Sequence, residues 1–218
     1  MRKYKLNKEE IKTVLEILKK NYPDAKSELS FKNPFELLIA TIMAAQSTDR
    51  QVNIITKKLF ELYPSPEDMV KLSEEELGKL IKSSGFYRNK SKNILKACEI
   101  LLKEHQGEVP KTREELVKLP GVGRKTANVV ISNVFGQDAI AVDTHVFRVT
   151  NRIGIVKAKT VEATEEELME KIPKDLWSEA HHWFILHGRR VCKARKPLCE
   201  ICELRQYCIY NRKLRNES

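Results

Sequence analysis

The chain has 218 residues and a formal net charge of +10, from 40 lysines and arginines against 30 acidic residues. This length allows one large or two small domains, each with its own core. Basic residues occur along the whole chain, which favours a nucleic acid as partner over an anionic membrane surface. No apolar run approaches the length of a membrane span, and the N-terminal sequence lacks the features of a signal peptide. We therefore expect a soluble, cytoplasmic protein with no membrane partner.

Helical periodicity extends through nearly every segment. A capping box at Asn7 precedes the first expected helix, whose apolar stripe consists of Ile11, Val14, Leu15 and Leu18. Because such a helix is not stable alone, it must pack on another part of the chain. Further helices are predicted over residues 34–45, 48–63, 89–104, 126–134, 144–151, 162–171 and 176–187, with short ones after Ser65, Ser73 and Thr112. Only residues 139–142 could form a strand, and four residues do not make a sheet, so the predicted fold class is all-α.

The most informative segment is residues 119–126, Leu-Pro-Gly-Val-Gly-Arg-Lys-Thr. Gly121 and Gly123 allow a tight turn that brings backbone N–H groups close to a ligand. Because a helix follows, these amides lie at its N-terminus, where phosphate binds favourably. Lys125 lies in the first turn beside Arg124, where the helix dipole disfavours a cation. A lysine that releases its proton readily can act as an amine nucleophile, and the alternative is a helix hairpin with a solvated lysine.

The segment Val-Asp-Thr-His places Asp143 eighteen residues after Lys125. On this pattern alone, Asp143 is better explained as the N-cap of the following helix than as a catalytic carboxylate. His145 fits a hydrogen-bonding residue near a site as well as it fits a participant. Three further histidines, His181, His182 and His187, do not share a helix face, so packing or DNA contact explains them better than a metal site.

Four of the five cysteines form the pattern C-x6-C-x2-C-x5-C at Cys192, Cys199, Cys202 and Cys208. In a cytosolic chain, such clustering indicates metal ligands rather than disulfides. Four thiolates suit either zinc or a [4Fe–4S] cluster. A zinc ribbon usually pairs two C-x2-C knuckles and this chain has one, so the spacing favours iron–sulfur and leaves zinc open. Cys98 stands apart in an apolar helical pattern and is expected to be a buried thiol.

Three cations, Lys193, Arg195 and Lys196, lie between the first two cysteines of this group. A loop held by metal bonds and carrying three positive charges would be a stiff clamp for DNA phosphates. The alternative is a solvated charged loop. Several phosphate contacts of this kind should make DNA binding fall steeply with salt.

Taken together, the chain resembles the endonuclease III family of DNA glycosylases, within the helix-hairpin-helix glycosylase superfamily. The matching segments follow the family order over about residues 30 to 208: residues 45–49, 85–87 with Lys90 and Asn93, 119–128, 142–148, 181–183, 186–189 and the four cysteines. The resemblance implies a two-domain helix-hairpin-helix fold with a [4Fe–4S] cluster on these cysteines. A helical barrel domain would comprise residues 27–137, and an iron–sulfur cluster domain residues 1–26 plus 138–218.

The resemblance also implies the chemistry. The enzyme would act as a monomer, near the nucleoid of a prokaryote, on double-stranded DNA that contains damaged bases or abasic sites. A damaged base must leave the duplex before its glycosidic bond can be attacked. Lys125 would attack the sugar, displace an oxidised pyrimidine and form a Schiff base, after which β-elimination cuts the strand. Asp143 would stabilise positive charge on the sugar and help to move protons.

Further residues gain roles only through the resemblance. Gln46 would fill the space that the extruded nucleotide leaves, and Asp49 would lie near the pocket. Phe86 corresponds to a second wedge, where the family more often has an aliphatic residue, and an aromatic ring can also stack between bases. The backbone at Gly121 and Gly123, together with Arg124, would bind DNA phosphate, and His145 would lie near the site.

Two other functions compete with this one. A mismatch glycosylase would act on adenine opposite oxidised guanine, or on thymine opposite guanine. Such enzymes generally lack a lysine at the position of Lys125 and use water as the nucleophile. A non-catalytic iron–sulfur protein that binds DNA is the other possibility, against which the intact pair of Lys125 and Asp143 argues.

Overall fold

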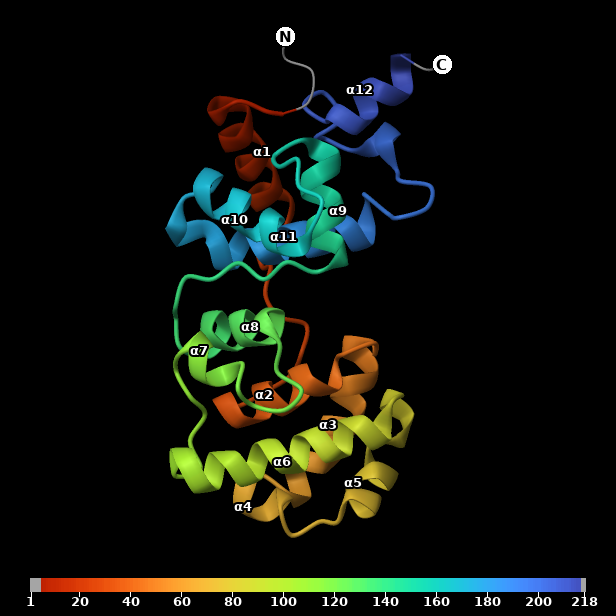
Figure 1. Cartoon of the computed structure of the whole chain (residues 1–218). Coiled ribbons are helices and arrows are strands. Elements are labelled where there is room, and N and C mark those ends of the chain that lie inside the picture. The colour runs from red at the N-terminus through yellow and green to blue at the C-terminus, as the bar shows by residue number, and fades with distance from the viewer. Residues whose placement is uncertain (1–4, 217–218) are drawn as a thin grey trace. The chain divides into compact units, whose positions relative to one another are not determined.

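The computed structural model describes residues 5–216, and all regular structure in this range is helical (Figure 1). The predicted all-α fold class is therefore confirmed. Residues 139–142, which were considered as a strand, form no regular element. Among the described residues, no helix has both the length and the apolar character needed to cross a bilayer.

The chain divides into two compact units. The continuous unit is Ser27–Gln137, and the discontinuous unit joins the segment that ends at Lys26 to the segment that starts at Asp138. The continuous unit contains α2 (Pro34–Met43), α3 (Asp49–Leu62), α4 (Pro66–Met69), α5 (Glu74–Leu80), the 3-10 helix η1 (Lys82–Ser84), α6 (Tyr87–His105), α7 (Arg113–Leu116) and α8 (Arg124–Val134). The discontinuous unit contains α1 (Lys8–Asn21), α9 (Thr144–Ile153), α10 (Val161–Lys171), η2 (Lys174–Leu176), α11 (Trp177–Arg190), η3 (Cys199–Ile201) and α12 (Ile209–Asn216). The functional roles predicted for the two ranges stay predictions, and residues 1–4 and 217–218 lie outside the described residues.

Side-chain caps explain most helix starts. Before α1, the Asn7 side chain accepts from the Glu10 amide and the Glu10 carboxylate accepts from the Asn7 amide, each over 2.9 Å. The predicted capping box is therefore present, and Ser73 forms the same arrangement with Glu76 before α5. These bonds satisfy amides that have no partner inside the helix.

Some boundaries differ from those predicted, for local reasons. Helix α8 starts two residues early, at Arg124, because Gly123 is its N-cap. Helix α6 also starts two residues early, at Tyr87, after Phe86 in a left-handed conformation. Helix α2 ends at Met43 instead of at residue 45, α11 continues to Arg190, and α12 was not predicted.

The continuous unit is built around α2. Eight of its ten residues are buried, and it contacts α3, α6 and α8. A helix that is buried on nearly all sides belongs in the centre of a domain, and its one acidic residue, Glu36, accepts a hydrogen bond from the Lys32 amide over 2.7 Å. Helices α3 and α6 each bury one face against it, so the segments at the C-terminal end of α2 are held on a rigid base.

In the discontinuous unit, the apolar stripe of α1 packs on α11 (Figure 1). Val14 and Leu18 are fully buried in one cluster with Val146 of α9 and Phe184 of α11. The sequence predicted that this helix must pack on another part of the chain. Its packing surface is formed by α9 and α11, which lie more than 120 residues further along the chain. Burying each such side chain contributes about 1.5–3 kcal/mol.

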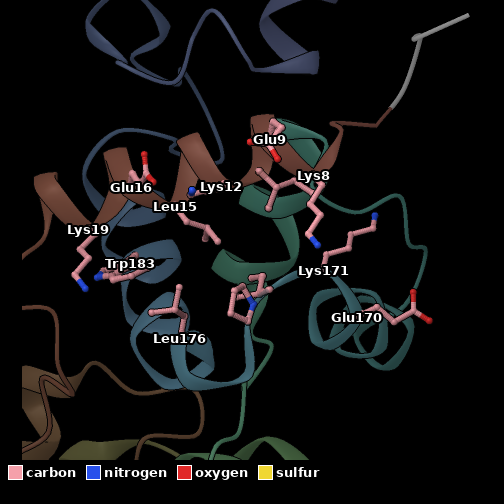
Figure 2. A pocket seen from close by; sticks show the side chains of 13 residues that line it. Lys8, Glu9, Lys12, Leu15, Glu16, Lys19, Glu170, Lys171, Leu176 and Trp183 are labelled. Carbon is pink, nitrogen blue, oxygen red and sulfur yellow. The ribbon is translucent and has the colours of Figure 1, made fainter.

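A cavity of about 490 Å³ lies beside α1 on this unit. Figure 2 shows Leu15, Leu176 and Trp183 around it, with lysine and glutamate side chains of α1 at its edge. A second cavity, of about 840 Å³, lies on the continuous unit between residues 28–36 and α3. Of the residues proposed for DNA contact or chemistry, only Asp49 lines either of these two cavities.

Candidate active site and metal centre

The turn between α7 and α8 has the tight geometry that its glycines suggest. Gly121 has φ +80°, and a Cβ there would lie 3.1 Å from the Cβ of Asn93 and 3.2 Å from Cγ2 of Ile42. Leu119 and Val122 are buried on either side, and the Val122 amide donates to the Leu119 carbonyl over 3.1 Å. Both the backbone angle and the close neighbours therefore call for glycine at position 121. The turn is held against α2 and α6.

The N-terminus of α8 has no side-chain cap. Gly123 is extended, with φ −91° and ψ 176°, and nothing lies within 4 Å of where its Cβ would be. Helix amides in this position need acceptors from outside the helix, and an anion supplies them. Arg124 and Lys125 are both exposed in this first turn. The local arrangement expected from the sequence is thus present.

Three predicted DNA contacts have left-handed backbones. Non-glycine residues with positive φ, among residues 5–216, are Gln46 (54°), Phe86 (48°), Gln106 (54°) and Lys196 (51°). Three of these four were assigned to DNA contact, and Gln106 ends α6. A left-handed residue other than glycine costs roughly 1–2 kcal/mol, and such strain gathers at functional sites. The side chain of Phe86 is 63% exposed, as a wedge requires.

The segments that carry Gln46 and Phe86 are neighbours on the continuous unit. Gln46 precedes α3, which Thr48 caps and Asp49 begins. Farther along α3, the Gln51 side-chain amide donates to the Ser83 hydroxyl of η1 over 2.9 Å. Because Ile42 also touches the turn at Gly121, the packing around the α2–α3 loop connects the Gln46, Phe86 and hairpin segments.

Asp143 is the N-cap of α9. Its Oδ1 accepts from the amides of His145 and Val146, each over 2.8 Å, and its Oδ2 lies 3.4 Å from Nδ1 of His145. The side chain is 14% exposed. The capping role favoured by the pattern is therefore present, and it does not compete with a catalytic role. Backbone amides that donate to a carboxylate stabilise its ionised form and fix its orientation.

The four clustered cysteines line one cavity, together with apolar side chains that include Ile153 and Leu204. Among residues 5–216, no three His, Cys, Asp or Glu side chains are grouped as the ligands of a single ion would be. Nη1 of Arg152 lies 3.8 Å from the sulfur of Cys192, and Nε2 of His187 lies 3.6 Å from that of Cys202. Four thiols around a shared space, with N–H groups near the sulfurs, suit an anionic iron–sulfur cluster.

Comparison with known proteins agrees with this geometry. A family model described as "HhH-GPD superfamily base excision DNA repair protein" matches residues 39–174, and one described as "Iron-sulfur binding domain of endonuclease III" matches residues 192–208. Endonuclease III of Rickettsia conorii is 52% identical over 92% of this chain and 95% of its own length. Endonuclease III of Escherichia coli K12 is 47% identical over 96% and 99%. The chain belongs to the endonuclease III family.

A solved structure of a trapped endonuclease III–DNA covalent intermediate, in an estranged-adenine complex, has a TM-score of 0.92. It is 50% identical and covers 96% of this chain and 99% of its own. As a member of this family, the protein is a base-excision-repair DNA glycosylase with an associated abasic-site lyase activity. It binds DNA and carries a [4Fe–4S] cluster, which confirms the cofactor that the family resemblance implied.

Two arginines to which the sequence analysis assigned no role hold the cysteine loop. Arg148 donates to the carbonyls of Cys192 over 3.1 Å and Gly188 over 3.0 Å. Arg152 donates to the carbonyls of Lys193 over 2.7 Å and of Ala194 over 3.0 Å. The two residues are four apart on α9 and share a face, which is the only sequence signal for their joint role. Lys193, Arg195 and Lys196 are exposed on the loop that they anchor.

The remaining cysteine and the helix α11 histidines are packing residues. Cys98 is fully buried, which confirms the expected buried thiol, and burial raises the pKa of this thiol to about 12. His181, His182 and His187 are 3%, 8% and 3% exposed. Burial lowers the pKa of both His182 and His187 to about 4. Tyr22 of α1 lies within hydrogen-bond distance of His187, at 3.2 Å.

Proposed function

We propose that this protein removes oxidised pyrimidines from double-stranded DNA and cuts the strand at the abasic site, with Lys125 as the nucleophile. One observation carries the proposal. Lys125 is an exposed amine in the first turn of a helix that follows a glycine turn and has no side-chain cap. A phosphate bound at that N-terminus would hold a deoxyribose next to the lysine.

The reaction divides into two stages. The amine nitrogen of Lys125 attacks C1′ of the sugar with its lone pair, and the C1′–N bond breaks as the base leaves with the electron pair and takes up a proton. Ring opening gives a Schiff base, which makes the C2′ proton acidic. Loss of that proton and cleavage of the C3′–O bond cut the strand, and the downstream strand leaves with a phosphate at its 5′ end. The carboxylate of Asp143 stabilises the positive charge on the sugar and assists these proton transfers.

The proposed DNA contacts lie on both units. On the continuous unit, the hairpin amides and Arg124 bind phosphate, while Gln46 and Phe86 fill the space of the extruded nucleotide. His145 supports Asp143 on the discontinuous unit, where Lys193, Arg195 and Lys196 bind phosphate. The cluster, held by Cys192, Cys199, Cys202 and Cys208, cross-links the loop that presents these cations. The protein acts on DNA as a monomer, close to the nucleoid.

Borohydride trapping on duplex DNA with one abasic site tests the nucleophile. Reduction leaves an enzyme covalently joined to DNA only where an amine has formed a Schiff base. Wild type should trap and Lys125→Ala should not, while Lys125→Arg controls for the loss of positive charge. Equal trapping by Lys125→Ala would reassign the nucleophile. If wild type does not trap, the proposed lysine chemistry is wrong, and a mismatch glycosylase or a non-catalytic DNA-binding protein would explain the result better.

A set of duplexes that each contain one modified base tests the substrate. Thymine glycol and other oxidised pyrimidines should be released faster than a thymine mismatched with guanine or an adenine opposite oxidised guanine. Preferential release of either mismatched base would contradict the proposed substrate class while leaving the trapping result intact.

A further inference from the structure

Helix α6 of the continuous unit buries a lysine. Lys90 is 5% exposed, and its ammonium donates to the carbonyl of Ser84 over 2.8 Å in a buried position. Lysines are rarely buried so completely without a specific partner. Burial lowers the pKa of Lys90 below its ordinary value, and the N-terminal part of a helix is also an unfavourable place for a cation. A lysine that is both buried and near a helix N-terminus costs stability, so we expect its side chain to serve a function.

The backbone of the same residue makes a second bond. The amide of Lys90 donates to the carbonyl of Phe86 over 3.1 Å. Lys90 therefore binds the carbonyl that precedes Gly85 and the carbonyl that follows it by one residue. The amide bond is the first regular i→i−4 bond of α6, which any residue but proline would make, so only the bond from the ammonium depends on the lysine side chain. Gly85 and Phe86 lie between the two carbonyls.

Both of these residues have unfavourable backbone conformations. Gly85 has φ 68° and ψ 156°, a region that only glycine occupies readily, and Phe86 has φ 48° and ψ 27°. No side chain caps the start of α6. Since the Phe86 ring is 63% exposed, its packing supplies little to hold this conformation. The Gly85 carbonyl accepts from the Ser84 hydroxyl over 3.3 Å and the Gly85 amide donates to the Lys82 carbonyl over 3.4 Å. The shorter bond from the Lys90 ammonium joins the Ser84 carbonyl to a side chain of α6.

The other end of the loop is fixed as well. Ser84 is 2% exposed, and its amide donates to the carbonyl of Ile81 over 2.9 Å. The neighbouring Ser83 accepts a hydrogen bond from Gln51 of α3. Because Ser84 is buried and hydrogen-bonded on both sides, the bond from Lys90 links the start of the loop to α6. This link restrains Gly85 and Phe86, the two residues that follow Ser84.

We propose that Lys90 is a positioning residue that holds Gly85 and Phe86 in the conformation that presents the Phe86 ring to the DNA duplex. The inference rests on the proposed wedge role of Phe86. A ring held in place before binding loses less conformational entropy when it enters the base stack. Removing the side-chain bond should therefore slow extrusion of the damaged base and leave the chemistry at Lys125 intact.

Lys90→Met tests this, because methionine fills a similar volume and lacks the donor. Single-turnover excision of thymine glycol from a duplex should slow roughly 10- to 100-fold. The fluorescence of 2-aminopurine beside the lesion should rise less, because fewer bases are unstacked. Borohydride trapping on single-stranded abasic DNA, which has no base stack to enter, should not change. Lys90→Arg keeps a donor and should recover much of the duplex rate, and exposed Lys96→Met on the same helix should match wild type.

A double-mutant cycle with Phe86→Ala separates the possible failures. If Lys90 acts through the ring, the double variant should excise no more slowly than Phe86→Ala alone. If the rate losses of the two single variants multiply in the double variant, Lys90 does not act through the ring. Full duplex activity in Lys90→Met would also overturn the proposal, as would a loss of single-strand trapping as large as the loss of duplex excision. If Phe86→Ala is itself as fast as wild type, the wedge role fails and the inference fails with it. Failure of wild type to trap would instead reject the proposed chemistry.

Discussion

Asp143 combines two functions in one carboxylate. The two amide bonds to Oδ1 cap α9, and the same bonds orient the group that the proposed reaction needs. Because asparagine caps a helix about as well as aspartate does, the two functions can be separated.

Asp143→Asn should keep the free energy of unfolding within about 0.5 kcal/mol of wild type, because the cap survives. Asp143→Ala should lose roughly 1 kcal/mol by the same argument. Both variants should excise thymine glycol far more slowly, since neither carries the charge. Urea unfolding and single-turnover assays measure the two effects. Wild-type excision by the asparagine variant would show that the carboxylate charge is not required.

His182 makes stability depend on pH. Its pKa is about 4 in the folded protein against a reference value of 6.5, so the unfolded chain binds more protons between these values. The free energy of unfolding should therefore fall as the pH drops from 6.5 to 4, by roughly 3 kcal/mol from this residue. Urea unfolding from pH 4 to 7 should give a smaller pH dependence for His182→Gln. Parallel curves for the two proteins would contradict this origin.

The residues proposed to contact DNA on the continuous unit lie at helix ends: in the hairpin turn before α8 and in the loops that carry Gln46 and Phe86. The turn at Gly121 has a left-handed backbone and is closely packed, whereas the N-cap at Gly123 is open. The first glycine serves the fold, and the second keeps backbone amides accessible.

Alanine at each position should separate these roles. Gly121→Ala should cost roughly 1–3 kcal/mol of stability, because alanine must adopt a left-handed backbone against close neighbours. Gly123→Ala should cost less than about 1 kcal/mol. Its new methyl group should nevertheless weaken DNA binding by shielding the amides of α8. Thermal unfolding and fluorescence anisotropy with labelled duplex measure the two outcomes, and equal stability losses would contradict the assignment.

At the scale of the molecule, charge governs the encounter with DNA. The chain carries +10 before its cofactor is counted, and a cluster with four thiolate ligands contributes about −2, which leaves the protein strongly basic. Arg148 and Arg152 bind backbone carbonyls of the cysteine loop, which anchors the segment that carries its three cations.

The logarithm of the DNA association constant should fall linearly with the logarithm of salt concentration. Lys193→Gln and Lys196→Gln should each reduce the magnitude of that slope by about 1. The exposed Lys79→Gln on α5 removes the same charge from a helix with no proposed DNA contact and serves as control. Anisotropy titrations over a range of salt concentrations measure the slopes. If Lys79→Gln changes the slope as much as Lys193→Gln does, the loop is not a phosphate clamp.

Much of this protein follows from sequence alone, because its signals are local. Capping residues such as Asn7 and Ser73 act on amides three residues away, and apolar stripes repeat every turn, so helix positions need no knowledge of the fold. The glycine turn before Lys125 and the cysteine spacing are local in the same sense. Tertiary structure decided what depends on distant partners: the left-handed backbone at Phe86 held by a buried Lys90, and the carbonyls that Arg148 and Arg152 reach some 40 residues away. A backbone carbonyl has the same chemistry at every position, so no pattern of side chains reveals which one a buried donor will meet.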